Sequence, residues 1–525
     1  MKVGGYEMKK TIAACMAALL ICTGCQTAGE QEAAATPPAA SPTPTATPAA
    51  AKPAQGGKIA MSMRTPQTLN PLLNEDATVD AILRLVFEPL AVPDAALKPV
   101  PNPALVKSIE TSPDGMSVLI TLLPDAKWSD GEPVTAKDIE HSVAALRNAP
   151  DGAVYKASAG NIAAVELVGD KAARLNLAQP FGAMAYMLMF PLIPAHRAVT
   201  GDIEPSEAIG NGVYTVTGYN AADALILTAS ETAAVRPYIN EITVRIIPDR
   251  ASELSAFDQG IIQAVAPGLS DWTRYLSAQD VRVSKYVTTC FELVGFNFEK
   301  EAMQNADVRR LTASIAGDEA FLSALFLDSA VRAAAPVSPE SWLYAKDTPT
   351  PTANKQSAVI ALAGQEVRIL VNEENTERVR IAEHLAEGLR AEGISTARVQ
   401  ALPFDAYQEA LAVGDFEMFV GGYNLSLAPE LSFLFHSENA GGTNLFRYQN
   451  ETMDALLAAA FAATGDLNLR RAMDELQRYV AEDLPCVGLV FRKSALLTSA
   501  SIYAEPEPVE QALFTGIEAW FVEVQ

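Results

Sequence analysis

Residues 128–146, WSDGEPVTAKDIEHSVAAL, predict an exposed turn followed by a capped helix. The Asp-Gly pair that ends at Gly131 is a turn signal, because glycine tolerates positive φ and aspartate bonds its own backbone. Thr135 can cap the helix, with Asp138 three residues later as in a capping box. One apolar face at i, i+4 and i+7 is then formed by Ile139, Val143 and Leu146.

Periodicity predicts further elements on both sides of this stretch. Apolar alternation indicates strands, and capping residues followed by helical spacing indicate helices. The strands expected before residue 300 are 58–64, 117–122, 242–247 and 292–298. A helix capped by Asp76 or Thr78 is expected after the first of them. Its buried side would carry Ile82, Leu83, Val86 and Phe87.

Strands and helices alternate regularly between residues 366 and 420. The expected elements are strands 366–371, 394–401 and 416–420, with helices 376–391 and 404–412 between them. Such a run implies parallel pairing with right-handed crossovers. Because ligands of parallel sheets lie at the carboxyl ends of the strands, the loop after Val420, GGYNLSLAPELSF, is expected to make contacts. A helix at 467–484 and a strand at 487–491 follow, and the chain closes on aromatic strand residues at 514–516 and 520–521.

The chain is long, acidic and rich in apolar residues. Its 525 residues predict two or three lobes, and 49% apolar residues suffice for large cores. There are 39 Lys+Arg against 63 Asp+Glu, which gives a formal net charge of −24. This balance argues against a nucleic-acid partner, because such binding needs basic surface to neutralise phosphates.

The first 25 residues have the composition of a targeting segment. A basic pair precedes an apolar core at 12–22, which is too short to span a bilayer. Small residues before Cys25 resemble a bacterial lipobox, although Cys22 stands where leucine is usual. That resemblance implies cleavage before Cys25 and lipid modification of its thiol, and an ordinary secretory signal is the alternative. Residues 26–56 are rich in Ala, Pro and Thr and predict a disordered tether.

Few residues offer the chemistry of a metal centre or an active site. The four histidines are scattered, at His141, His196, His384 and His436. No H-E-x-x-H motif or G-x-S-x-G nucleophile elbow occurs, and His384 is expected on a solvated helix face. We therefore expect no metal, cofactor or catalysis. Cys290 and Cys486 could form a disulfide or remain as buried thiols, and buried thiols are favoured.

Several short motifs occur in an order that resembles the family 5 extracellular solute-binding proteins. These are the dipeptide, oligopeptide and nickel receptors of ABC importers. The stretch 128–146 resembles the family signature W-x-D/H-D-G-x-P-x-x-A-x-D-V. Further matches are Leu69-Asn70-Pro71, Glu88-Pro89-Leu90, the turn 210–214, the element that begins at Asp249-Arg250, and Asp307-Val308-Arg309. The turn departs from the family pattern, because Val213 replaces a proline.

The resemblance implies an α/β fold of the two-lobed periplasmic-binding-protein type, namely type II of the large peptide-receptor class, with a hinge between the lobes. The domains implied are a lipoprotein signal peptide at 1–25, a linker at 26–56, lobe I at 57–269, lobe II at 270–490, and a return to lobe I at 491–525. Hinge crossings are expected near 266–272 and 487–493. A solute bound between the lobes would shift an open–closed equilibrium toward the closed form.

The resemblance also places the ligand-binding residues at the junction of the lobes. Asn74, Glu75 and Asp76 correspond to an acidic segment that approaches the ligand backbone in peptide receptors. The alternative is that Asp76 caps a helix and Glu75 complements its dipole. Tyr423 corresponds to a frequent cleft aromatic that would stack on the solute, and the alternative is a core aromatic.

Further contacts are expected from Asn424, Ser426 and Asn444. Peptide receptors carry an aspartate a few residues after the cleft aromatic, whereas residues 424–428 are all uncharged here. A blocked or modified peptide is therefore an open alternative to a peptide with a free amino terminus. Glu430 is the nearest carboxylate in the sequence.

The function that the resemblance implies is capture of a peptide or peptide-like solute and its delivery to an ABC permease with its ATPase subunits. The receptor would act as a monomer on the outer face of the bacterial cytoplasmic membrane, held there only by its lipid anchor. Three alternatives stay open at this point. They are a receptor for a metal chelate or haem, a surface-tethered hydrolase, and a sensor or adhesion module.

Overall fold

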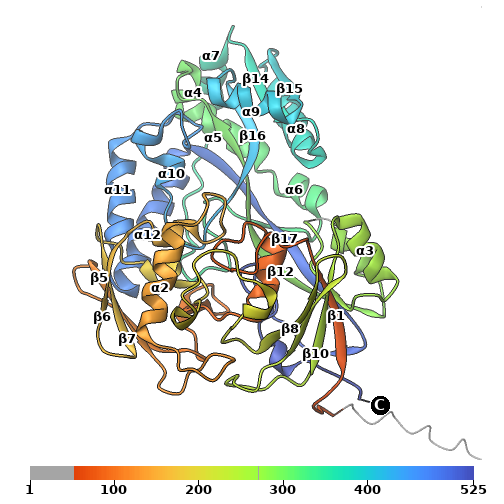
Figure 1. Ribbon diagram of the computed structural model, residues 1–525. Coiled ribbons are helices and arrows are strands. Elements are labelled where there is room, and N and C mark those ends of the chain that lie inside the picture. Colours follow the sequence, from red (N-terminus) through yellow and green to blue (C-terminus); the bar gives the residue numbers. More distant parts are fainter. Residues whose placement is uncertain (1–51, 270, 525) are drawn as a thin grey trace, which may run out of the picture. The chain divides into compact units, whose positions relative to one another are not determined.

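The computed structural model describes residues 52–269 and 271–524 (Figure 1). The expected signal peptide, the expected lipidation site Cys25 and the linker up to residue 51 lie outside the described residues. Within the described part, none of the helices combines the length and the apolar character needed to cross a bilayer.

Two four-stranded sheets form from the segments before residue 250. The first contains, in spatial order, β1 (Lys58–Met63), β10 (Glu241–Ile246), β9 (Ala224–Ala229) and β8 (Tyr214–Asn220). The second contains β4 (Val106–Thr111), β5 (Ser117–Leu122), β7 (Ala172–Leu177) and β6 (Ile162–Leu167). Only β1 and β10 pair in parallel; the other neighbours are antiparallel. The strands predicted at 58–64, 117–122 and 242–247 are confirmed.

Helices and short elements connect these sheets. The α-helices are α1 (Ala77–Leu83), α2 (Ala136–Arg147) and α3 (Arg250–Asp258). Two short strands, β2 (Ala91–Pro93) and β3 (Pro99–Pro101), pair with each other. The 3-10 helices are η1 (Lys156–Ala159), η2 (Met184–Leu188), η3 (Ala195–Arg197) and η4 (Pro205–Glu207).

The helix predicted from the opening stretch is α2. The backbone N–H of Thr135 donates to the Asp138 carboxylate at 2.6 Å, which secures the first turn. Gly131 adopts φ +91 in the preceding turn, the left-handed region that favours glycine. The three apolar residues at helical spacing are fully buried, and each contributes roughly 1.5–3 kcal/mol by leaving water. The prediction for residues 128–146 is confirmed.

A seven-stranded sheet organises the second half of the chain. Its spatial order is β11 (Ala264–Val265), β17 (Cys486–Ser499), β12 (Val281–Phe296), β16 (Met418–Asn424), β14 (Val367–Asn372) and β15 (Ala397–Leu402), with β13 (Ala330–Arg332) also paired to β17. The connections are α8 (Thr376–Ala391) and α9 (Phe404–Val413), which accompany β14 to β16 in Figure 1. Because β14 pairs in parallel with both β15 and β16, the predicted βαβαβ run is confirmed.

The remaining elements surround this sheet and close the chain. The helices are α4 (Glu301–Gln304), α5 (Ala306–Ala316), α6 (Glu319–Phe326), α7 (Lys355–Leu362), α10 (Ser432–Phe435), α11 (Glu451–Ala462) and α12 (Asp466–Asp483). The 3-10 helices are η5 (Asp271–Tyr275), η6 (Ser437–Asn439) and η7 (Ile517–Ala519). The last strands, β18 (Ile502–Tyr503) and β19 (Phe521–Val522), form an antiparallel pair.

The two long strands β12 and β17 exceed the predicted strands 292–298 and 487–491. Residues 291–295 of β12 pair with 486–491 of β17, and residues 281–287 continue the ladder with 493–499. The register shifts between Val287 and Phe291, so this ladder has an irregularity at its middle. The extended parts of β12 and β17 contain hydroxyl and basic residues, so a search for apolar runs does not detect them as strand. The lobe boundaries and hinge crossings given above remain predictions.

Three local expectations can be compared directly with the structure. His384 is half-buried: its ring stacks on the Phe321 ring at a centroid distance of 3.8 Å, while Glu383 and Glu387 beside it are exposed as expected of a solvated face. A neighbouring helix covers the histidine in part, which the spacing within one helix cannot reveal. Phe514 lies in a turn rather than in the expected strand. Cys290 and Cys486 are buried free thiols, which confirms the favoured alternative.

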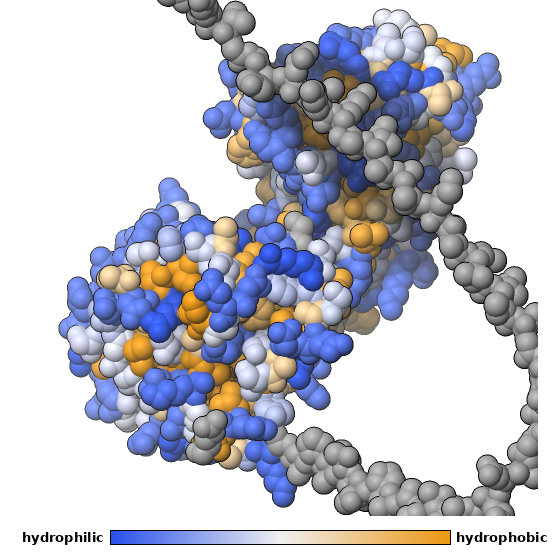
Figure 2. Space-filling model, turned by 90° about the vertical axis from the view of Figure 1, so that its right-hand side faces the viewer, coloured by the Kyte–Doolittle hydropathy of each residue, from blue (hydrophilic) through white to orange (hydrophobic). Residues whose placement is uncertain are grey.

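The surface differs in character from the cores. Figure 2 presents a face on which hydrophilic residues predominate and hydrophobic residues gather in smaller patches between them. Three clusters of buried apolar residues lie inside, and Trp128, Trp272 and Trp520 are among their largest members. The protein therefore has the large apolar cores that its apolar content predicted, although its overall composition is acidic.

Candidate functional site

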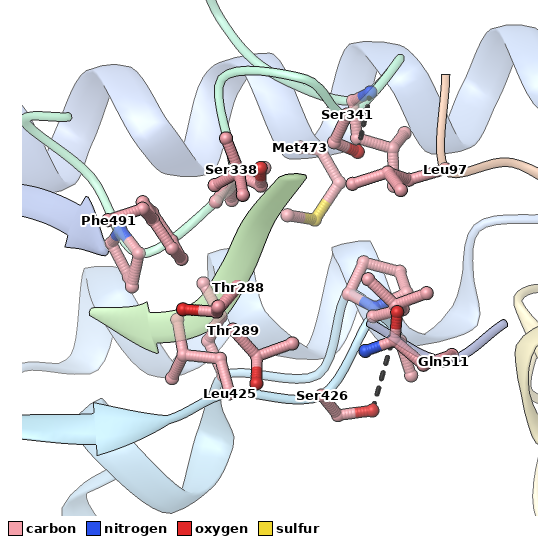
Figure 3. A pocket seen from close by; sticks show the side chains of 18 residues that line it. Leu97, Thr288, Thr289, Ser338, Ser341, Leu425, Ser426, Met473, Phe491 and Gln511 are labelled. Atoms are coloured by element: carbon pink, nitrogen blue, oxygen red, sulfur yellow. Dashed lines mark hydrogen bonds between the residues drawn. The ribbon is translucent and has the colours of Figure 1, made fainter. Parts of the chain in front are cut away.

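The loop after β16 forms one wall of a cavity, which we call the loop cavity (Figure 3). It has a volume of about 560 Å³, including space open to solvent. Its other walls include residues 287–289 of β12, part of the segment 336–343, and Gln511. Figure 3 places Ser426 and Gln511 on one side of the cavity and Ser338 and Ser341 on the opposite side.

The loop cavity has apolar walls with a few hydroxyl groups. No charged side chain lines it among the described residues. The hydroxyls belong to Thr288, Thr289, Ser338, Ser341 and Ser426. A mostly apolar cavity with a few polar groups is the usual form of a small-molecule site. The arrangement suits an uncharged part of a ligand.

A second cavity, which we call the strand cavity, lies beside the first. It is lined by the first turn of α1, by Arg250 and Glu253 of α3, by residues 264–269, and by Glu510. Its volume is about 870 Å³, including space open to solvent. Thr288 lines both cavities, so they meet at β12.

The strand cavity contains one carboxylate that no cation balances. Arg250 lies 3.6 Å from Glu253, and Glu253 also accepts a hydrogen bond from the Ser62 hydroxyl at 2.7 Å. Glu510 accepts a hydrogen bond from the Thr289 backbone N–H at 2.7 Å. No basic side chain among the described residues forms an ion pair with Glu510. The charged groups that line this cavity therefore sum to a negative charge.

The irregularity in β12 explains why Thr289 is available to Glu510. Between Val287 and Phe291 the strand leaves its register with β17. The Thr289 carbonyl accepts from the Leu425 N–H at 2.9 Å, which ties the strand to the loop after β16, while its own N–H bonds Glu510. Irregularities of this kind re-aim residues beside binding sites.

The predicted residues Asn74, Glu75 and Asp76 lie just before α1. The Asp76 carboxylate accepts from the N–H groups of Thr78 and Val79 at 2.7 and 3.1 Å, so Asp76 caps the helix. Asn74 is buried and exchanges two hydrogen bonds with the Asp76 backbone. None of the three lines either cavity, although α1 itself does. Their contact with a ligand remains a prediction.

Of the residues predicted after β16, the structure brings Ser426 into the loop cavity. Tyr423 packs against Phe433 and Phe446, at centroid distances of 6.1 and 6.4 Å. Its hydroxyl is buried without a hydrogen-bond partner, and burial raises the pKa of that hydroxyl well above its usual range. Asn424 ends β16 with an exposed side chain and does not line the cavity.

Asn444 and Glu430 hold loops together instead of facing the cavity. Asn444 is fully buried, and its amide donates to the carbonyl of Tyr448 at 2.9 Å. Glu430 accepts from the Ser432 N–H at 2.7 Å, at the start of α10. Sequence reasoning missed the residues that β12 and the chain end contribute, above all Thr288, Thr289 and Glu510. Glu510 follows the proline-rich segment 505–509, which signals only a loop.

A buried ionic cluster lies in the sheet next to β16. Glu292 is 1% exposed, and its carboxylate accepts from Arg378 at 2.7 and 3.2 Å. Arg492 lies 3.9 Å from Glu292 and 3.6 Å from Glu377. Burial, together with the charge of Glu292, raises the pKa of the Cys290 thiol to about 12. No group of three or more His, Cys, Asp or Glu side chains arranged to hold a metal ion is found in the described ranges.

Comparison with known proteins gives a family match that covers about two thirds of the chain. Residues 100–444 match the family described as bacterial extracellular solute-binding proteins, family 5 Middle. The oligopeptide-binding protein AppA of Bacillus subtilis is 22% identical over 512 residues, which cover 90% of this chain and 93% of AppA.

Solved structures agree in fold. The structure of AppA from Bacillus subtilis in complex with a nonapeptide has a TM-score of 0.64 at 21% identity, over 90% of this chain and all of that one. The structure of NikZ from Campylobacter jejuni in complex with Ni(L-His) has a TM-score of 0.66 at 19% identity, over 89% of this chain and 99% of that one. The expected α/β fold of the periplasmic binding proteins is confirmed.

Proposed function

Because this chain belongs to the family 5 bacterial extracellular solute-binding proteins, we propose that it captures a peptide or peptide-like solute and presents it to the permease of an ABC importer. It is a binding protein rather than an enzyme, as its relatives are. Support for a peptide comes from AppA, which is named an oligopeptide-binding protein and matches over nine tenths of this chain.

The observation that carries the proposal is the pairing of an uncharged cavity with one unbalanced carboxylate. The ligand would place its amine at Glu510 and its first apolar part in the loop cavity, because the two cavities meet at Thr288. In a partly desolvated site an amine and a carboxylate select strongly for each other. Glu510 would thus compensate for the missing aspartate among residues 424–428.

Binding of short peptides with free and acetylated amino termini tests this arrangement. Isothermal calorimetry should find the free peptides bound about tenfold or more tightly than the acetylated ones, which corresponds to about 1.4 kcal/mol. Glu510→Gln should abolish that preference while keeping an acceptor for the Thr289 N–H. Glu507→Gln changes an exposed carboxylate of the same segment and should leave the preference intact.

Two results would contradict the proposal. One is equal affinity for free and acetylated peptides, which would remove Glu510 from the site. The other is that native mass spectrometry of protein purified from its own host finds a metal chelate or haem as the co-purifying ligand, which would replace the peptide.

We also propose that the mature protein is anchored by a lipid on Cys25, acts as a monomer at the outer face of the cytoplasmic membrane, and works with the ATPase subunits of the importer. The small residues before Cys25 and the tether composition of residues 26–56 support the anchor. Cys25→Ser should release the protein into the medium. Full retention of that variant on the membrane would refute the lipid anchor and leave the binding proposal untouched.

A further inference from the structure

A third cavity, which we call the α1 cavity, lies between the end of α1, the turn 210–213 and the segment 512–518. Its volume is about 1180 Å³, including space open to solvent, which leaves room for a small ligand. Ala, Val, Leu, Pro and Phe side chains form most of its wall. It shares Ala81, Leu513 and Phe514 with the strand cavity but contains none of the residues of the loop cavity.

The turn 210–213 is fixed against residues 85–86, which follow α1. The N–H of Gly212 donates to the Val86 carbonyl at 2.8 Å, and a Cβ on Gly210 would meet the same oxygen at 1.9 Å. Only glycine allows this close approach. The Asn211 side chain is thereby held in the wall of the cavity, where its carbonyl oxygen accepts from the Glu88 N–H at 2.9 Å.

Two polar groups in this wall lack partners of the protein's own. The Asn211 amide nitrogen Nδ2 is buried without a hydrogen-bond partner. The Glu88 carboxyl accepts from Asn102 at 2.7 Å through Oε2, and Oε1 has no partner within the described part of the chain. A buried polar group without a partner is rare and costs about 1–3 kcal/mol, so the Asn211 amide requires an explanation, whereas Glu88 is half-buried and offers a free acceptor beside it.

The neighbouring charged groups do not satisfy these positions. Arg84 lines the cavity but donates to Asp80 at 3.1 Å, to the Tyr155 hydroxyl at 2.9 Å and to a carbonyl. Glu518 carries the same charge as Glu88. The open positions are therefore one hydrogen-bond donor, Asn211 Nδ2, and one acceptor, Glu88 Oε1, in an apolar enclosure.

We propose that the α1 cavity is a second binding site, which adjoins the strand cavity and shares no residue with the loop cavity, for a small apolar molecule that carries a primary carboxamide. The carboxamide oxygen would accept from Asn211 Nδ2, and its NH₂ group would donate to Glu88 Oε1. The apolar body would fill the space lined by Ala, Val and Pro side chains. A carboxylate in place of the amide would face the like charges of Glu88 and Glu518.

Calorimetry and ligand-observed NMR with cyclohexanecarboxamide as the probe test this site at pH 8. The wild-type protein should bind the amide at millimolar concentrations or below, and should bind cyclohexanecarboxylate about tenfold more weakly or not at all. Asn211→Ala should weaken amide binding about tenfold, because the donor is lost. Ala233→Phe, which fills the cavity, should abolish binding, whereas Ala222→Phe alters an exposed turn elsewhere and should not.

The proposal is overturned if the amide fails to bind the wild-type protein, if the carboxylate binds as tightly as the amide, or if Ala233→Phe binds the amide normally. Thermal unfolding of each variant shows whether it is folded, and Ala233→Phe keeps the test decisive if Asn211→Ala disturbs the turn. No peptide is used, so failure here is independent of the peptide-binding proposal.

Discussion

The ionic cluster at Glu292 and the α1 cavity at Glu88 both remove a carboxylate from water, and they differ in what balances its charge. Glu292 has Arg378 at 2.7 Å and Arg492 at 3.9 Å. Glu88 has only the neutral Asn102 amide in hydrogen-bond contact, and burial raises its pKa from 4.5 to about 7. The like charge of Glu518 acts in the same direction.

This difference separates a carboxylate that holds the fold together from one that is open to a ligand. A buried carboxylate with two arginines satisfies its own charge and part of theirs, and its removal leaves Arg378 uncompensated and Arg492 with Glu377 alone. A carboxylate with no cation in hydrogen-bond contact keeps a free acceptor, and desolvation moves its pKa toward neutral pH although the charge of Arg84 opposes that shift. Removal of the carboxylate charge is therefore expected to lower the free energy of unfolding at Glu292 and to raise it at Glu88.

The largest effect is expected at Glu292. Glu292→Gln should lower the free energy of unfolding by ~3–5 kcal/mol, because Arg378 then remains buried without a counter-charge and Arg492 keeps only Glu377. Urea unfolding monitored by circular dichroism measures it. The matched control is Glu366→Gln, which breaks an exposed pair with Arg398 and should cost less than ~1 kcal/mol. A loss below ~1 kcal/mol for Glu292→Gln would mean that Glu292 does not hold the fold together more strongly than an exposed ion pair.

The next effect is expected at Glu88, with the opposite sign and a dependence on pH. Its pKa is higher in the folded than in the unfolded chain, so the stability gained by proton binding is complete below about 4.5 and is lost as the pH rises through about 7. Glu88→Gln should therefore be more stable than the wild type by ~2–3 kcal/mol at pH 8. The difference should shrink toward zero as the pH falls to 4.5.

Unfolding of both proteins across that pH range measures this difference. Glu110→Gln, at an exposed glutamate, should track the wild type throughout. A Glu88→Gln variant that is less stable than the wild type at pH 8 would mean that a cation balances Glu88.

The smallest effect is expected at Tyr423, where a neutral polar group rather than a charge lacks a partner. Tyr423→Phe keeps the packing on Phe433 and Phe446 and removes the orphan hydroxyl, so the protein without ligand should gain ~1 kcal/mol. If the solute bonds this hydroxyl, the same variant will bind it more weakly. A loss of stability without ligand would mean that the hydroxyl already has a partner, such as a bound water.

Local features of the fold were predictable where periodicity and capping agree. The helix at 376–391 has the predicted boundaries. Asp76 caps α1, which was the predicted alternative to a ligand contact. Long-range features were not. The length of β12 and its irregularity depend on pairing with β17, some two hundred residues away, which no window of the sequence contains.

The candidate site divides in the same way. The loop after β16 was expected to make contacts, and its Ser426 does line a cavity. Asn444, predicted as a contact, is instead enclosed by its own hydrogen bonds. The sequence could not identify Thr289 and Glu510 as candidate site residues. They are far apart in the chain, and only the folded structure brings the Thr289 N–H to the Glu510 carboxylate.

By itself the sequence determined the family and the α/β elements, and it predicted the side of the parallel strands on which contacts are made, because these follow from local spacing and short motifs. Only the tertiary structure decided which carboxylates are balanced, which polar groups lack partners and which cavities meet. Those properties depend on distances between segments that the chain brings together after folding, and charge and hydrogen bonding act through such distances rather than through sequence order.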